Sequence, residues 1–370
     1  MSDEAPGPDT SPDAGAADDG AAAPEVCASV EADGSPGAPV LAQRRLLARL
    51  KYVEPSQLVA AMAVIVILAA AAVALSILGW PFGDDPFADL PDDPSVRVGL
   101  AGYFPADDED PLIEPTGIAI DGSRVYITEA GAGRVAIFSV KGERAGEVEL
   151  EVADGQSRAV PTAITEVGSR RFAVVDARGN RVYVYRVSGG SAELLYRLGE
   201  DDPDIAPARP TAVTYHGREL YVADSTAGDI KVYDRDGGLV RSLSGDAATS
   251  LGHVGGMAVA GRQLVVSQSG ANRVLALDLK TGSVIATFED AYALPRGVAA
   301  VRDGVAVAEV LGAAVRVCDA DGEQTHSIDA KTVPGGPPAA PECAAWHDRT
   351  GRLYVTEPDL GRVTVYGVRR

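Results

Sequence analysis

Six carboxylate or amide side chains recur at intervals of roughly 40 to 50 residues, each at the end of a short run rich in Val, Tyr or Thr. They are Glu129, Asp176, Asp224, Gln268, Glu309 and Glu357. If the fold brings these positions to one rim, their negative charge can attract a metal cation, a basic partner or a hydroxyl-rich ligand. We therefore take these six residues as candidate binding residues.

The same pattern has a structural interpretation. An acid at a strand end can accept backbone N–H bonds from the following turn and pair with a base five residues on, where Arg134, Arg181 and Arg362 stand. The base is missing at this spacing in the third and fifth copies, which have Asp229 and Ala314. Repetition in nearly every copy is typical of a scaffold, so the sequence favours a turn cap.

Other candidates for chemistry are few. The four histidines, His216, His253, His326 and His347, fall at different positions of the repeat, whereas a zinc ion needs its ligands within about 2.1 Å. Glu166 is the one carboxylate expected in the innermost strands, which makes it a weak candidate metal ligand. We expect no cofactor, although a bound divalent cation such as Ca²⁺ is compatible with this pattern.

The repeated unit predicts the elements that carry these residues. Three strand-like runs separated by turn residues, with a fourth run after them, predict a four-stranded antiparallel meander. The copies begin at Pro115, Pro161, Pro210, Val254, Pro295 and Pro341. A period of this length is typical of propeller blades, so we predict an all-β, six-bladed β-propeller over residues 96–370.

The two ends of the repeat region complement each other. The sixth copy stops at Arg370 without a fourth strand, while the run 96–104 precedes the first copy without a blade of its own. An open sheet edge would expose unpaired backbone groups. We therefore expect the N-terminal run to supply the outer strand of the last blade and to close the ring.

The repeat resembles the NHL repeat. Each copy reads approximately Pro-x-Gly-hydrophobic-Ala, then a Tyr-Val-x-Asp-like strand, then Arg-Val-x-Val-Tyr and a Gly turn, best matched at Pro115–Gly142 and Pro210–Gly237. The resemblance implies a six-bladed propeller. It leaves activity open, because such propellers serve both as binding platforms and as enzymes.

The N-terminal quarter of the chain differs in composition. Residues 1–41 hold nine carboxylates and no Lys or Arg, which predicts a disordered acidic cytoplasmic tail. A basic juxtamembrane segment, 42–57, precedes an uncharged run that predicts a transmembrane helix at 58–80. A Pro- and Asp-rich stalk, 81–95, follows. The positive-inside rule then predicts a single-pass protein of the cytoplasmic (plasma) membrane, with a cytoplasmic N-terminus and the C-terminal propeller outside.

The loops between the copies are the least alike. The loop 199–209 contributes Asp201, Asp202 and Asp204, which we add to the candidate binding residues. The net charge of −20 belongs mostly to the N-terminal part, since residues 115–370 have 33 acidic and 28 basic side chains. A basic footprint for nucleic acid is therefore missing.

Two cysteines of the repeat region occupy packing positions of the repeat. Cys318 takes the apolar position of Phe138 in the first copy, and Cys343 takes the small-residue position of Gly117. We expect two buried side chains and no disulfide between them.

The function that these features favour is a membrane-anchored, extracytoplasmic binding or assembly module, whose partner is another extracytoplasmic protein or a ligand. The alternative is an extracytoplasmic, metal-dependent hydrolase or lyase similar to the gluconolactonase-like propellers. Such enzymes hold a divalent cation in the central channel, where this sequence offers Glu166 alone.

Overall fold

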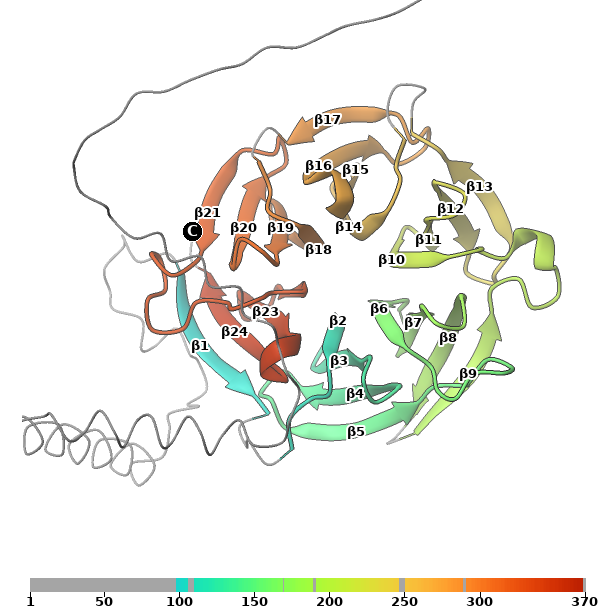
Figure 1. Ribbon diagram of the computed structural model, residues 1–370, viewed down its shortest axis with the longest axis horizontal. Coiled ribbons are helices and arrows are strands. Elements are labelled where there is room, and N and C mark those ends of the chain that lie inside the picture. Colours follow the sequence, from blue (N-terminus) through green and yellow to red (C-terminus); the bar gives the residue numbers. More distant parts are fainter. Residues whose placement is uncertain are drawn as a thin grey trace, which may run out of the picture. The chain divides into compact units, whose positions relative to one another are not determined.

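The computed structural model describes residues 98–105, 110–168, 170–188, 191–245, 250–288 and 291–368, and these form six four-stranded antiparallel sheets around a central axis (Figure 1). The predicted tail, basic segment, transmembrane helix and stalk, 1–41, 42–57, 58–80 and 81–95, lie outside the described residues. Within the described ranges, no helix is both long and apolar enough for a membrane span.

The sheets follow the chain as consecutive blades, each built from the centre outwards. Blade 1 contains β2 (Pro115–Asp121), β3 (Arg124–Glu129), β4 (Arg134–Ser139) and β5 (Arg144–Glu149). Blade 2 contains β6 (Pro161–Glu166), β7 (Arg171–Asp176), β8 (Arg181–Ser188) and β9 (Ser191–Arg197). Blade 3 contains β10 (Pro210–His216), β11 (Glu219–Asp224), β12 (Asp229–Asp234) and β13 (Leu239–Leu243).

The second half repeats this order. Blade 4 contains β14 (Val254–Ala260), β15 (Gln263–Gln268), β16 (Arg273–Asp278) and β17 (Val284–Phe288). Blade 5 contains β18 (Pro295–Val301), β19 (Gly304–Glu309), β20 (Ala314–Asp319) and β21 (Gln324–Ile328). Blade 6 contains β22 (Cys343–His347), β23 (Arg352–Glu357), β24 (Arg362–Val368) and β1 (Val98–Phe104). Short 3-10 helices occur at η2 (Pro203–Ile205), η3 (Ser269–Ala271) and η4 (Pro358–Leu360).

The N-terminal strand closes the ring, as the sequence predicts. β1 pairs antiparallel with β24, with Val98 opposite Val368 and Phe104 opposite Val363. Blade 6 thereby combines both ends of the propeller and has no unpaired edge at β24. The first strands of blades 1 to 5 begin at the first residue of each copy, whereas that of blade 6 begins at Cys343, two residues after its copy begins.

The hydrophobic core lies between the blades. Each blade pair encloses one cluster of buried side chains, for example Tyr126, Phe172 and Tyr183 between blades 1 and 2. This follows from the alternation of side chains along a strand, because every sheet has a neighbour on both faces and buries both. We call the face with the connections from second to third strand the upper face, and the opposite face the lower face.

Candidate functional site

The six candidate residues at the ends of the second strands are buried. Their exposed fractions lie between 0% and 3%, in the order Glu129 0%, Asp176 1%, Asp224 1%, Gln268 3%, Glu309 1% and Glu357 0%. Burial of an ionised carboxylate is costly unless hydrogen bonds and a nearby cation compensate for the lost water. Their hydrogen bonds therefore determine what these side chains can do.

Each of the five carboxylates accepts a backbone N–H from the loop that leads into its own blade on the upper face. Glu129 accepts from Ile113 at 2.9 Å, and Glu309 accepts from Ala293 at 2.7 Å. The other three bonds are Val160 N to Asp176 Oδ1 at 2.8 Å, Ala208 N to Asp224 Oδ2 at 2.7 Å and Ala339 N to Glu357 Oε1 at 2.7 Å. The acids thus fix the path of the chain between neighbouring blades.

Gln268 follows the same rule with donor and acceptor exchanged. Its Nε2 donates to the carbonyl oxygens of Ser250, at 2.8 Å, and Leu251. Here the loop presents acceptors, which a carboxylate could not satisfy. The exception in the sequence pattern therefore reflects the local backbone of blade 4.

Basic side chains complete these caps. Arg134 lies 2.7 Å from Glu129 and Arg362 lies 3.3 Å from Glu357, five residues on as predicted. In blades 3 and 5 the basic residue stands seven positions after the acid and not five. Lys231 lies 3.8 Å from Asp224, and Arg316 lies 2.6 Å from Glu309.

Blade 2 departs from the predicted pairing with Arg181. Among the described residues, Asp176 uses Oδ1 to accept the backbone N–H groups of Val160 and Arg178, and its Oδ2 has no hydrogen-bond partner. Gly179 packs against this carboxylate and leaves no room for a side chain. The cap in blade 2 is therefore made by backbone donors.

Asp224 illustrates the electrostatics of a cap. Burial by itself would raise the pKa of this carboxyl, but the backbone N–H groups of Ala208, Ala227, Arg209 and Thr226 together hold the pKa below its ordinary value of 3.8. The site therefore favours the charged form.

The acidic loop after blade 2 is exposed but ordered by local bonds. Asp201, Asp202 and Asp204 are all exposed, and Asp202 caps η2 by accepting the backbone N–H of Asp204 at 3.1 Å. The hydroxyl of Tyr233 donates to the Ile205 carbonyl at 2.6 Å and attaches the loop to blade 3. The loop thus presents three carboxylates to solvent from a fixed backbone.

The central channel contains a cavity of about 300 Å³ between the six first strands. Its polar lining includes Glu166, as predicted, together with His216 and Glu342. Burial, and then the nearby Asp121, raises the pKa of Glu166. Sequence reasoning missed Glu342, which stands one residue before its strand and pairs with Arg296 at 2.6 Å.

The described residues contain no group of three His, Cys, Asp or Glu side chains that could hold a metal ion. His347 is buried and uses both ring nitrogens, with Nε2 2.9 Å from the Gly122 carbonyl and Nδ1 2.7 Å from the Thr350 hydroxyl. Burial, and then Arg296 and Arg209, lower the pKa of His253.

The two described cysteines, Cys318 and Cys343, form no disulfide with each other. Cys318 is buried among blades 4 and 5, and Cys343 is half-buried where the first strands of blades 5 and 6 approach each other. Cys318 is buried as predicted, whereas Cys343 is less buried than predicted.

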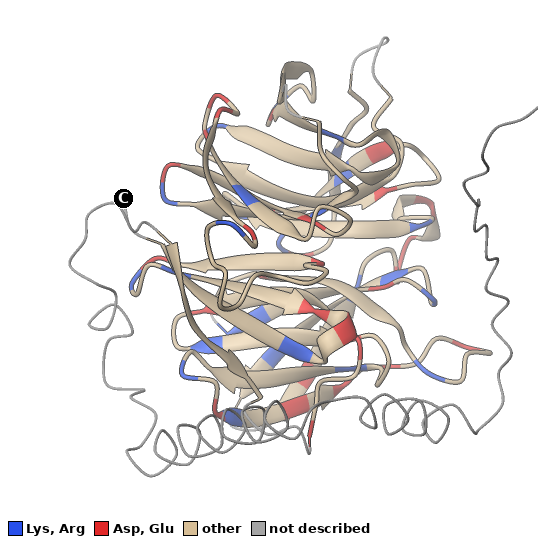
Figure 2. Cartoon of the chain, turned by 60° about the vertical axis from the view of Figure 1, so that its left-hand side comes forward, with Lys and Arg blue, Asp and Glu red and all other residues tan. Residues whose placement is uncertain are grey.

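Positions of Lys or Arg and positions of Asp or Glu are interspersed along the ribbon of the blades in the view of Figure 2. This agrees with the near balance of 33 acidic and 28 basic residues over 115–370.

No family model and no curated protein sequence matches this chain. Among solved structures, a streptogramin B lyase is similar over 74% of this chain and 88% of its own, at 17% identity and a TM-score of 0.51. Virginiamycin B lyase from Staphylococcus aureus is similar over 70% and 82%, at 15% identity and a TM-score of 0.48. The β-propeller domain of Cps50 (Swd1) from Myceliophteria thermophila is similar over 69% and 83%, at 17% identity and a TM-score of 0.47. At 17% identity, the likeness to the streptogramin B lyase shows the fold, a β-propeller, and nothing of the activity.

Proposed function

We propose that this chain is a membrane-anchored, extracytoplasmic propeller of the NHL type that binds or assembles another protein or a ligand through its upper face. The uncharged run within 58–80 is the anchor, the acidic segment 1–41 lies in the cytoplasm, and the stalk 81–95 separates the propeller from the bilayer. The charge difference across the apolar run supports this orientation.

One observation carries the proposal of binding. The recurring acids, which would be the obvious reactive groups, are buried and hold the upper-face loops in place. The upper-face loops therefore differ from blade to blade, while the ring of sheets that carries them is rigid. Variable loops on a rigid scaffold are where recognition sites usually lie.

The loop 199–209 supplies the best-defined surface of this face. Its exposed Asp201, Asp202 and Asp204 favour a partner with a basic surface. Because the backbone is already fixed by η2 and Tyr233, little ordering entropy is lost when a partner binds.

The test uses the full chain fused to a proximity-labelling enzyme in its source cells. The variant Asp201→Asn, Asp202→Asn, Asp204→Asn removes three charges and leaves the η2 cap an acceptor. The control Asp236→Asn, Asp321→Asn, Glu323→Gln removes three exposed charges at lower-face turns. We expect a defined extracytoplasmic protein to be labelled by wild type and control and lost with the loop variant. Labelling that is equal in all three would contradict the proposal.

The alternative function is a metal-dependent hydrolase or lyase that works in the channel. Glu166, with its raised pKa, and His216 both stand at the lower ends of first strands and line the channel, and they favour this alternative. Titration of the full chain with Ca²⁺ or Zn²⁺ would then give a saturable rise in melting temperature that Glu166→Gln abolishes. A melting temperature independent of both ions would exclude this alternative.

A further inference from the structure

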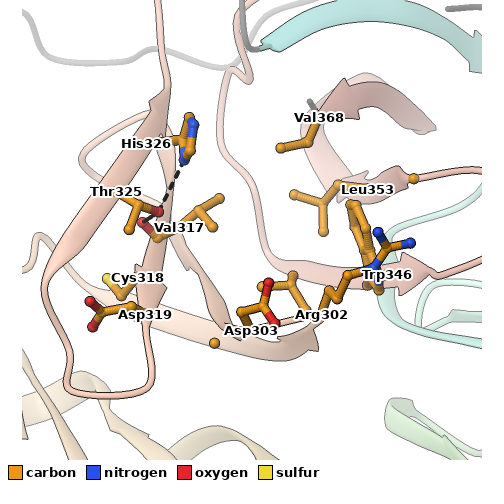
Figure 3. A pocket seen from close by; sticks show the side chains of 13 residues that line it. Arg302, Asp303, Val317, Cys318, Asp319, Thr325, His326, Trp346, Leu353 and Val368 are labelled. Carbon is orange, nitrogen blue, oxygen red and sulfur yellow. Dashed lines mark hydrogen bonds between the residues drawn. The ribbon is translucent and has the colours of Figure 1, made fainter. Parts of the chain in front are cut away.

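A second cavity, of about 680 Å³, lies between blades 5 and 6 near the lower face (Figure 3). Its walls are Val301 and Gly304 from blade 5, facing Trp346, Leu353 and Val368 from blade 6. Val317, Thr325 and His326 line it toward the rim of blade 5. This volume falls within the range of small-molecule sites, about 300 to 1,000 Å³.

The repeat explains why the cavity exists. At the third position of the second strand, blades 1, 3 and 6 have Tyr126, Tyr221 and Tyr354, whose rings are buried between neighbouring blades. Blade 5 has Ala306 at this position, in one cluster with Val317 and Leu353, which line the cavity. The cavity thus lies where three other interfaces hold a tyrosine ring.

Two other blades show that a small residue alone does not open a cavity. Blades 2 and 4 have Ala173 and Val265 at this position. Their interfaces instead receive Tyr196 and Phe288 from outer strands. The outer strand of blade 5 has Thr325 and His326 near this level, where blades 2 and 4 have Tyr196 and Phe288, and both line the cavity.

A hydrogen-bond acceptor for a phenol stands at the end of the cavity. In the interface of blades 6 and 1, the Tyr354 hydroxyl donates to the Val140 carbonyl at 2.8 Å. The residue of blade 6 that is equivalent to Val140 is Val368. Each lies six positions after the first Arg of its third strand. Each also donates its backbone N–H to a carbonyl in the turn between the first and second strands of its blade. Val368 lines the cavity.

The chemistry of the lining indicates which class of ligand the cavity would bind. The walls contributed by Val301, Leu353 and Val368 are apolar, so an ionised ligand would lose more hydration energy on entering than a neutral one. The indole of Trp346 offers an aromatic wall (Figure 3). We propose that this cavity is a binding site for a neutral, single-ring phenol, which takes the place that tyrosine side chains occupy in blades 1, 3 and 6.

Calorimetric titration of the full chain with p-cresol, the analogue of the tyrosine side chain, tests this proposal. We expect saturable binding at one site. Toluene should bind about three- to tenfold more weakly because it lacks the hydroxyl. 4-Hydroxyphenylacetate should also bind more weakly, because its carboxylate would lose hydration against the apolar walls.

The variant Ala306→Tyr should place its own ring where we propose that the phenol binds, abolish p-cresol binding and raise the melting temperature. Val240→Tyr, at a position 50% exposed on the outer strand of blade 3, adds the same ring elsewhere and should bind p-cresol as wild type does. If Ala306→Tyr does not fold, Trp346→Leu replaces it and should weaken binding at least tenfold. Absence of saturable binding to wild type, or wild-type binding by the folded Ala306→Tyr or Trp346→Leu variant, would overturn the proposal.

Discussion

At the residue scale, Glu309 shows how a single buried carboxylate connects three parts of a blade. One oxygen accepts the backbone N–H of Ala293 in the loop before β18, and the other accepts Nε of Arg316 on β20. Removal of the acid would take the acceptor away from the Ala293 N–H and from the Arg316 guanidinium. Desolvated groups that lose an acceptor destabilise the protein by more than the net free energy that the hydrogen bonds had contributed.

We predict that Glu309→Ala lowers the free energy of unfolding by about 3–5 kcal/mol. Glu309→Gln should cost less, about 1–2 kcal/mol, because its amide oxygen can still accept one of the two bonds. Urea unfolding of both variants measures the difference. If both variants lost the same free energy of unfolding, the hydrogen bonds of Glu309 would not be what stabilises the blade, which would contradict the prediction.

A second prediction concerns pH. The native pKa of Asp224 lies below its ordinary value of 3.8, so its stabilising contribution is fully present above that value and is lost as the pH falls through the native pKa. Wild type should therefore have a higher free energy of unfolding than Asp224→Asn, and the difference should be largest near neutral pH. This excess should shrink below pH 3.8. A difference that does not change with pH in urea titrations would contradict the lowered pKa.

At the element scale, β1 is the strand that turns an open array into a ring. Its last residue, Phe104, packs against Phe138 of blade 1, with ring centroids 5.0 Å apart, and against Tyr354 of blade 6, at 6.2 Å. One side chain thus joins the N-terminal strand to the first and last blades. Contacts of this kind bring together residues far apart in the sequence and carry a large loop-closure entropy.

We predict that Phe104→Ala lowers the free energy of unfolding by about 3–5 kcal/mol, because it leaves a cavity at the junction. The neighbouring Tyr103 points to the other side, is 44% exposed and lies under the guanidinium of Arg362. Tyr103→Ala should cost about 1 kcal/mol or less and serves as the control in the same urea experiment. A loss at Phe104 no larger than that at Tyr103 would show that the junction does not limit stability.

At the scale of the whole molecule, the direction of β1 determines where the preceding chain leaves the propeller. β24 runs from the upper to the lower face, and β1 is antiparallel to it, so Val98 lies at the lower face beside Val368. If the anchor that we propose is correct, the lower face is directed toward the bilayer and the acidic loop 199–209 away from it.

This orientation can be measured with single spin labels in lipid vesicles. A label at Ser191→Cys, on the lower face, should be closer to lipid than one at Asp202→Cys, on the upper face. The native cysteines are replaced first, and Cys343→Ala should be tolerated because other blades have Gly or Ala there. A label at Asp202→Cys that lies closer to lipid would contradict the proposed orientation.

Much of the propeller could be predicted from the sequence, because its information is local and repeated. Short runs rich in Val, Tyr and Thr predict strands, turn residues mark their ends, and six copies predict six blades. The missing fourth strand and the surplus run at 96–104 together predict the closure that β1 makes. The packing positions of Cys318 and Cys343 followed from the same alignment.

The tertiary structure alone determined which side chains meet across blades. Lys231 and Arg316 reach their acids from seven residues on, diagonally across two strands, which the spacing of five did not indicate. Glu342 entered the channel lining from a position before its strand. The cavity between blades 5 and 6 lies in the interface where the second strand has Ala306 and not a tyrosine. Local patterns specify strands, but the space between two sheets depends on the volumes of side chains from distant segments, and only the assembled fold brings these together.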